Sequence, residues 1–182
     1  MNARGYFGIG VLGVTKPMNV GNLVRTAHAF GARFVFLVDP HVSMREIGVS
    51  DTSAASGSMP FYTFDTMAQF ALPHRCRLVG IEFLEDAIDL PSFHHPPQAA
   101  YLLGPELDSL GPDVLARCDH VIRIPTRFCV NVATAGAMVM YDRILQAGRF
   151  EPRPVRPGGP SDGRALTGGR PGMVDPARVP RD

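Results

Sequence analysis

Three short segments of the sequence combine side chains that can bind or activate a ligand. The first carries the amide of Asn19 and the guanidinium of Arg25. The second presents the carboxylate of Glu106 after a tight Gly-Pro turn, and the third ends on the amide of Asn131. Groups of these types can hold a polar substrate and stabilise the charge that develops on it during a reaction.

Each of these segments follows a predicted strand or begins a predicted helix. Apolar runs alternate with amphipathic stretches in residues 1–150, which predicts an α/β fold with a mainly parallel sheet flanked by helices. In such sheets ligands bind at the carboxyl ends of the strands. The predicted strands are Tyr6–Val14, Phe34–Val38, Arg77–Phe83, Ala99–Leu103 and His120–Ile124. The predicted helices are Asn19–Phe30, Asp65–Leu72, Pro112–Cys118 and Val130–Ala147.

Two of the predicted helices carry information about packing. The helix over Asn19–Phe30 has one apolar stripe with Arg25 nearly opposite, and we expect Asn19 as its N-cap and Gly31 as its stop. The stretch Val132–Tyr141 is apolar around its whole circumference, so we expect it to be buried on all sides, partly by a second copy of the chain. Four small residues would let another helix approach it closely, namely Ala133, Ala135, Gly136 and Ala137.

A glycine motif near the N-terminus imitates a dinucleotide-binding fingerprint. Residues Gly8–Gly13 spell G-x-G-x-x-G, and Asp39 stands roughly where a ribose-binding acid would lie. The extended pattern continues past the motif, however, and the next helix is predicted to begin at Asn19, too late to hold a pyrophosphate. We therefore expect a glycine-rich strand beside another backbone, with an NAD-dependent oxidoreductase as a distant alternative.

Composition bounds the remaining possibilities. The chain has 182 residues and a net charge of +1, and its three cysteines show no metal-like spacing, so we expect reduced thiols and no metal. No apolar run approaches the roughly 18 residues of a membrane span, which favours a cytoplasmic protein without a membrane partner. The segment Glu151–Asp182 is rich in Pro and Gly and poor in large apolar side chains, so we expect residues 1–150 to form the domain and 151–182 a disordered tail.

In their order along the chain, the three segments resemble the motifs of the SpoU/TrmH-type RNA ribose methyltransferases of the SPOUT superfamily. The first two matches are N-x-G-x-x-x-R (Asn19, Gly21, Arg25) and L-G-x-E (Leu103, Gly104, Glu106). The third is I-P followed by a small residue, x-N and a helix (Ile124, Pro125, Cys129, Asn131). The resemblance covers about residues 6–148. The chain departs from the usual pattern at Cys129, where the family has Ser, and at Ala133, where it often has Ser or Asn; the segment before Asn131 is also shorter.

The resemblance implies an enzyme that uses S-adenosylmethionine to methylate a ribose 2′-hydroxyl in RNA, with tRNA preferred over rRNA. It implies a SPOUT-like fold with a C-terminal deep trefoil knot, and a homodimer in which Arg25 faces the partner's methyl donor. The implied catalytic residues are Arg25, Asn19, Glu106 and Asn131. The implied cofactor-binding residues are Ile81 or its neighbour Glu82, Gly104, Ile124, Cys129 and Val130. A non-catalytic RNA-binding relative of the same fold is the alternative.

Overall fold

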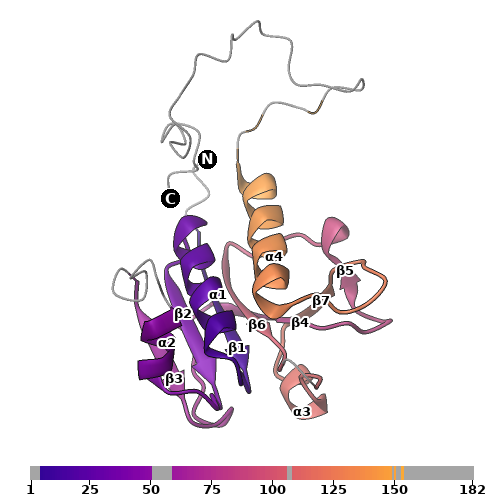
Figure 1. The fold of residues 1–182 in the computed structure, drawn as a ribbon. Helices are drawn as coiled ribbons and strands as arrows, with labels where there is room; N and C mark the ends of the chain where they lie inside the picture. Colours follow the sequence, from indigo (N-terminus) through magenta and orange to yellow (C-terminus); the bar gives the residue numbers. More distant parts are fainter. Residues whose placement is uncertain (1–4, 51–58, 106–107, 149, 151–152, 154–182) are drawn as a thin grey trace, which may run out of the picture.

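Seven parallel strands form a single sheet in the computed structural model of the protein (Figure 1), in the order β3-β2-β1-β6-β4-β7-β5. The structure describes residues 5–50, 59–105, 108–148, 150 and 153, so Glu106 and nearly all of the predicted tail lie outside it. The strands are β1 (Tyr6–Leu12), β2 (Phe34–Val38), β3 (Phe61–Phe64), β4 (Arg77–Ile81), β5 (Ile88–Asp89), β6 (Gln98–Leu103) and β7 (His120–Arg123). The prediction of an α/β fold with a parallel sheet is confirmed.

The helices are fewer and shorter on one side of the sheet than on the other. They are α1 (Pro17–Ala29), α2 (Met44–Ser50), the 3-10 helix η2 (Leu90–Ser92), α3 (Pro112–Leu115) and α4 (Val132–Ala147). The sequence analysis missed β3, β5, α2 and η2, all of which are short.

Helix α1 begins two residues earlier than predicted, and Asn19 is not its N-cap. Lys16 occupies the cap position and Pro17 the first turn, where its missing N–H and fixed φ suit a helix start. The predicted stop is confirmed, because Gly31 adopts a φ of +76° just after the helix. Asn19 is therefore a buried residue inside the first turn.

Helix α4 packs against α1 of the same chain. A Cβ added at Gly136 would come within 2.6 Å of Leu23 Cδ1, so the glycine allows the two helices to approach closely. The small residues Ala133, Ala135 and Gly136 are thus buried within one chain, and the prediction that small residues let another helix approach closely is confirmed at Gly136, where the helix is α1.

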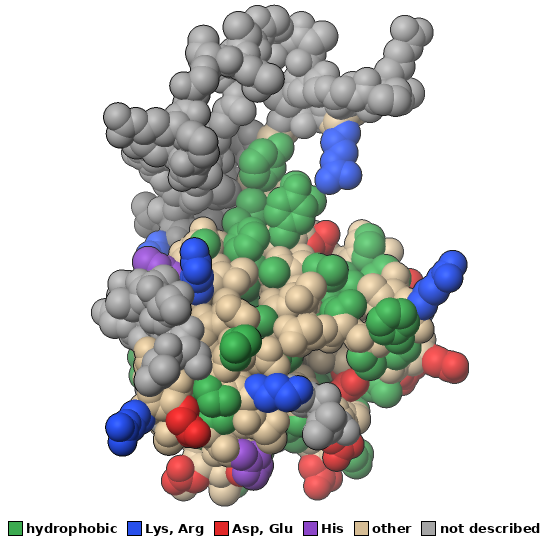
Figure 2. All heavy atoms as spheres, in the orientation of Figure 1, with side chains coloured by type: hydrophobic (Ala, Val, Ile, Leu, Met, Phe, Trp, Pro, Cys, Tyr) green, Lys and Arg blue, Asp and Glu red, His purple; other side chains and the backbone are tan. Residues whose placement is uncertain are grey.

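The opposite side of α4 is open, so the prediction that this helix is buried on all sides does not hold within one chain. Met138 is 38% exposed and Tyr141 is 51% exposed. Figure 2 shows hydrophobic side chains gathered along α4 on this face of the molecule. The sequence did not predict which side of α4 is exposed, because the exposed side is apolar too.

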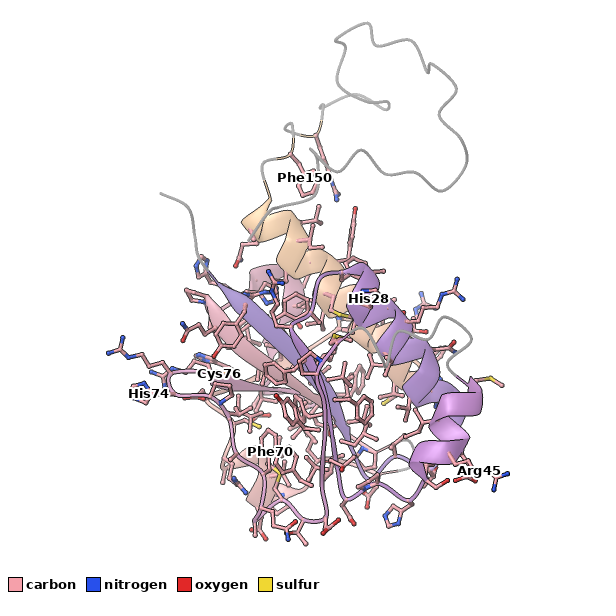
Figure 3. The ribbon with its side chains drawn as sticks, turned by 90° about the vertical axis from the view of Figure 1, so that its left-hand side faces the viewer. His28, Arg45, Phe70, His74, Cys76 and Phe150 are labelled. Atoms are coloured by element: carbon pink, nitrogen blue, oxygen red, sulfur yellow. The ribbon has the colours of Figure 1, made fainter. Side chains whose placement is uncertain are left out.

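The two faces of the sheet are covered in different ways (Figure 3). Helices α1 and α4 lie on one side of the sheet, whereas Phe70 and Cys76 lie on the other. The core between the sheet and helices α1 and α4 is called the first core, and the core on the opposite face, which contains Phe70, is called the second core. Strand β2 is buried throughout, as predicted, because Val35 and Leu37 face the first core while Phe34, Phe36 and Val38 face the second.

The segment Asp65–Leu72 covers part of the second core and is a series of turns, so the predicted helix is wrong. Arg117 donates from its guanidinium to the carbonyl oxygens of Met67 and Phe70, the latter at 3.1 Å. The ring of Phe70 stacks on Phe36 with 5.0 Å between centroids. A side chain from a distant part of the chain thus satisfies two carbonyls of these turns.

The glycine motif in β1 allows the neighbouring strand to approach. A Cβ at Gly8 would lie 2.3 Å from the ring of Phe34, and one at Gly10 would lie 2.2 Å from the carbonyl oxygen of Phe36. Both glycines belong to the strand and pair with β2, so the expectation of a glycine-rich strand beside another backbone is confirmed. The motif does not open a helix, and it offers no phosphate-binding turn of the dinucleotide kind.

A buried polar network fastens α4 to the amino-terminal end of the sheet. Arg143 donates to Tyr101 Oη at 3.1 Å and to the carbonyl of Pro97 at 2.9 Å. Tyr101 Oη lies 2.5 Å from Nδ1 of His95, and Nε2 of His95 lies 3.1 Å from Asp142. Burial raises the pKa of Tyr101 to about 12, so its hydroxyl keeps the proton that it donates to His95.

This network predicts an acid-sensitive fold. Burial lowers the pKa of His95 despite the hydrogen bond that its ring donates to the Asp142 carboxylate, and the nearby Arg143 lowers it further. The unfolded chain therefore binds more protons than the native one below about pH 6.5, so stability is full above that pH and falls as the pH drops toward the native pKa. We expect the thermal midpoint of the wild type to fall between pH 7 and pH 5 more steeply than that of His95→Gln. The exposed His74 gives the control: a slope that His74→Gln reduces equally would contradict the assignment to His95.

Candidate functional site

A hollow of about 470 Å³ opens at the carboxyl ends of β4, β6 and β7, beside the amino-terminal end of α4. This is the edge at which parallel α/β sheets bind ligands, and the volume lies within the range of small-molecule sites, roughly 300–1,000 Å³. Its described lining residues are Ile81, Glu82, Phe83, Leu103, Gly104, Pro105, Asp108, Ser109, Ile124, Thr126, Cys129, Val130, Asn131, Val132 and Ala135.

The structure brings most of the predicted site residues to this hollow. They are Ile81 and its neighbour Glu82, Gly104, Ile124, Cys129, Val130 and Asn131, and Leu103 of the second motif lines it as well. Glu106 lies outside the described residues, between Pro105 and Asp108, which both line the hollow. Arg25 and Asn19 do not line it.

Glu82 organises the floor between β4 and β6. Its carboxylate accepts hydrogen bonds from the backbone N–H of Leu110 at 2.8 Å and from that of Phe83 at 2.9 Å. A Cβ added at Gly104 would lie 3.2 Å from Glu82 Oε2 and 3.6 Å from Leu110 Cγ. The glycine therefore leaves room that any other residue would begin to fill.

The loop from Ile124 to Asn131 forms the wall nearest β7. Thr126 stabilises this loop, because its N–H donates to the carbonyl of Ile124 at 2.8 Å and its hydroxyl donates to that of Phe128 at 2.8 Å. The loop ends at Asn131, whose side-chain oxygen accepts from the N–H groups of Ala133 at 2.9 Å and Thr134 at 3.4 Å. Asn131 is thus the N-cap of α4 and fixes the start of that helix at the hollow.

The same asparagine joins the first and third sequence segments. Its Nδ2 donates to Asn19 Oδ1 at 3.0 Å, although the two residues are 112 positions apart. The two amides therefore lock the starts of α1 and α4 together. No local pattern announces this contact, since Asn19 looks like a helix cap in the sequence.

Loss of this cap has a measurable consequence. Asn131→Ala removes both cap bonds and the hydrogen bond to Asn19 Oδ1, and we expect the free energy of unfolding to fall by about 1–2 kcal/mol. Asn131→Asp keeps the accepting oxygens, and a rotated Asn19 amide can donate to it, so most of that loss should be restored. Urea unfolding measures both variants. Equal losses in the two would contradict a capping role.

Arg25 is exposed on α1, and it lies outside the hollow. The charged side chains that line the hollow, among the residues the structure describes, are those of Glu82 and Asp108, and both are acidic. If Arg25 acts at this hollow, as the sequence predicts, its guanidinium must come from outside the set of residues that line it.

Several lining residues were not singled out from the sequence. Phe83 ends a predicted strand, Thr126 comes two residues after another, and Asp108 and Ser109 follow the Gly-Pro turn, so their positions were the available signal. The apolar walls suit a flat ring, and the two carboxylates suit hydroxyl groups or a positive charge. Within the described ranges no group of three or more His, Cys, Asp or Glu residues could hold a metal ion. Among the same residues no helix combines the length and the apolar character that crossing a bilayer requires.

Comparison with known proteins points to one family. The sequence profile of the SpoU rRNA Methylase family matches residues 7–141. Over 138 residues the chain is 29% identical to the tRNA (guanosine(18)-2'-O)-methyltransferase of Escherichia coli strain K12, which covers 71% of this chain and 58% of that relative. Over 143 residues it is 25% identical to the 23S rRNA (guanosine-2'-O-)-methyltransferase RlmB of Acinetobacter baylyi, with 73% and 57% covered. The chain thus spans less than three fifths of the length of either relative.

Solved structures share the fold. The SpoU methyltransferase AviRb from Streptomyces viridochromogenes, in complex with the cofactor AdoMet, matches with a TM-score of 0.66 at 22% identity, over 79% of this chain and 61% of that one. At such an identity the likeness establishes the arrangement of strands and helices.

Proposed function

The chain belongs to the SpoU rRNA Methylase family, and from this membership we propose that it transfers a methyl group from S-adenosylmethionine to a ribose 2′-hydroxyl in RNA. The observation that carries the proposal is the hollow at the carboxyl ends of β4, β6 and β7. The second and third sequence motifs meet there, and the first motif is joined to the third by the hydrogen bond between Asn19 and Asn131.

The lining of the hollow fits the methyl donor. Ile81, Ile124 and Val130 would hold the adenine and exclude water, while Gly104 and Cys129 would let it reach the main chain. The carboxylates of Glu82 and Asp108 complement the positive charge and the ribose hydroxyls of the donor. When bound, the donor would supply a methyl group on its cationic sulfur: the 2′-oxygen would take the methyl carbon, the electron pair of the carbon–sulfur bond would stay on sulfur, and the hydroxyl proton would go to water.

Arg25 would complete this site from the other subunit of a homodimer. Since the charges that line the hollow in the described part of the chain are acidic, a partner is the simplest source of the guanidinium. An arginine stays protonated in proteins, so we assign Arg25 to hold the neighbouring phosphate and stabilise the developing alkoxide rather than to remove the proton. Asn19 and Asn131 would orient these groups, and Glu106 would pair with Arg25 or fix the loop around the donor.

The dimer would form through the open side of α4. Met138 and Tyr141 are exposed there, and Met18, near the start of α1, is 69% exposed. Exposed large hydrophobic side chains on neighbouring helices favour a protein partner. A second copy of the chain is the partner that also delivers Arg25.

A charge on this surface should separate the subunits. We expect Tyr141→Glu to give a monomer that transfers no methyl group, because the charge cannot be buried in the interface and a monomer lacks the partner's guanidinium. Tyr62→Glu is the matched control, since Tyr62 is 49% exposed on β3 at the far edge of the sheet. Light scattering gives the mass. A wild-type chain that is monomeric and active would refute the dimer.

For the substrate we propose tRNA ahead of rRNA, with the relative that acts on guanosine 18 of tRNA as the support. The test is mass mapping of ribose methylation in tRNA and rRNA from cells with and without the gene. Loss of one 2′-O-methyl group from a tRNA is the expected result, whereas loss from rRNA would correct the substrate. No change in either, with RNA binding retained, would favour the non-catalytic relative.

Two structural features belong to the same proposal. We assign residues 1–150 to the methyltransferase domain and the segment from 151 to 182 to a tail. We also assign a deep trefoil knot to the C-terminal part of the domain, supported by the family membership and by two loops, after β6 and after β7, that line one hollow.

A further inference from the structure

A second hollow of about 640 Å³ adjoins the first on the side of β5 and β7. It shares Phe83, Thr126 and Val130 with the first hollow, so the two are adjacent. Its other lining residues are Asp89, Arg123, Pro125, Arg127 and Phe128. Hydrophobic side chains gather in this region on the right of Figure 2, where β5 and β7 lie in Figure 1.

An exposed aromatic ring stands at this second hollow. Phe128 is 74% exposed, the largest fraction among the large hydrophobic side chains that the structure describes, and Phe83 is 44% exposed. The ring does not sit on a loose loop, because the Thr126 hydroxyl holds the carbonyl of Phe128 at 2.8 Å. Such exposure costs free energy in water, so a rigidly presented ring indicates a partner that covers it.

The two arginines of this hollow play different parts. Arg123 is fixed by hydrogen bonds, since its Nε donates to Asp89 at 2.6 Å and its Nη1 donates to the carbonyl of Leu84 at 3.2 Å. Its charge is therefore balanced, and it supports the floor. Arg127 is exposed and forms no ion pair with any residue in the described ranges.

We propose that Phe128 and Arg127 form a docking surface for an unpaired nucleotide of the RNA substrate, next to the nucleotide that is methylated. The base stacks on the ring of Phe128, with Phe83 at its edge, and the adjoining phosphate meets the guanidinium of Arg127. Unstacked bases bind aromatic faces and arginine planes in this way.

The adjacency of the two hollows favours RNA over a second protein chain. A ribose that reaches the first hollow must bring its neighbouring nucleotides across Phe83 and Thr126, which both hollows share. The proposal rests on the proposed function, because it places the second hollow beside the reacting ribose. It goes further by assigning the contact that selects single-stranded RNA.

The test compares Phe128→Ala with Phe128→Tyr, and uses Tyr62→Ala as the matched control at the opposite edge of the sheet. The probes are total tRNA and a fluorescently labelled single-stranded oligoribonucleotide. We expect Phe128→Ala to weaken RNA binding by roughly tenfold, as loss of one stacked base implies. Phe128→Tyr should retain the affinity, and calorimetry should give unchanged binding of S-adenosylmethionine in all three.

A second readout tests the phosphate contact. The slope of log affinity against log salt concentration should fall by about 0.7 in Arg127→Ala for the single-stranded probe. Arg127→Lys should keep the slope, because a point charge suffices for that term. An unchanged slope in Arg127→Ala would overturn the assignment of this residue.

Two results would overturn the surface as a whole. One is equal RNA affinity in Phe128→Ala and wild type. The other is dissociation of Phe128→Ala into monomers, which would make the ring part of an interface between copies. Failure of the proposed function looks different: wild type would then leave all RNA unmethylated while RNA binding still depended on Phe128.

Discussion

Arg25→Ala should reduce the rate of methyl transfer by about 10²–10³-fold and leave the affinity for S-adenosylmethionine within a few-fold, which is the loss typical of one charge-stabilising donor. The affinity should change little because Arg25 is exposed on α1 and lies outside the hollow that would hold the donor. Single-turnover kinetics and calorimetry measure the two quantities separately. Arg25→Lys should also be slow, because an ammonium does not reproduce a planar fork.

The matched control is Arg45→Ala. Arg45 is likewise exposed, and Figure 3 places it on α2, away from α4. Its replacement should leave the rate unchanged. A wild-type rate in Arg25→Ala would remove this residue from the mechanism, whereas an equal loss in both variants would indicate a general effect of surface charge on RNA binding.

Gly104→Val should abolish binding of S-adenosylmethionine, and with it all methyl transfer. A Cβ at this position lies 3.2 Å from Glu82 Oε2, and the branches of valine extend into the hollow or displace the carboxylate that holds Leu110. Calorimetry with the purified protein is the measurement. Gly48→Val in α2 serves as the control, since a Cβ there meets nothing within 4 Å. Normal binding by Gly104→Val would move the donor to another part of the molecule.

The two variants together test whether the site is shared between subunits. In a mixed dimer, the intact hollow of the Arg25→Ala subunit can receive Arg25 from the Gly104→Val subunit. Random exchange should therefore restore about a quarter of the wild-type rate, since half of the dimers are mixed and each has one complete site. No recovery would place Arg25 and the hollow in the same subunit.

The sequence alone determined what depends on local pattern. A continuous apolar run predicted that Phe34–Val38 would be buried on both faces, and closely spaced glycines predicted a strand beside another backbone. The carboxyl-end rule for parallel sheets then predicted where Gly104 and Ile124 would come together. These features follow from strand periodicity and from the size of a side chain, and both can be read from neighbouring residues.

Only the tertiary structure decided features that depend on distant partners. Asn19 is of a residue type that often caps helices, yet Pro17 starts the helix earlier and Asn131, from far along the chain, donates its amide N–H to the Asn19 side-chain oxygen. The segment Asp65–Leu72 has a helical pattern, yet it forms turns in which two carbonyls accept hydrogen bonds from the distant Arg117. Helix α4 is apolar all round, and α1 decides which side is covered because Gly136 lets Leu23 approach. In each case the local sequence allows more than one arrangement, and a contact with a residue far along the chain selects one of them.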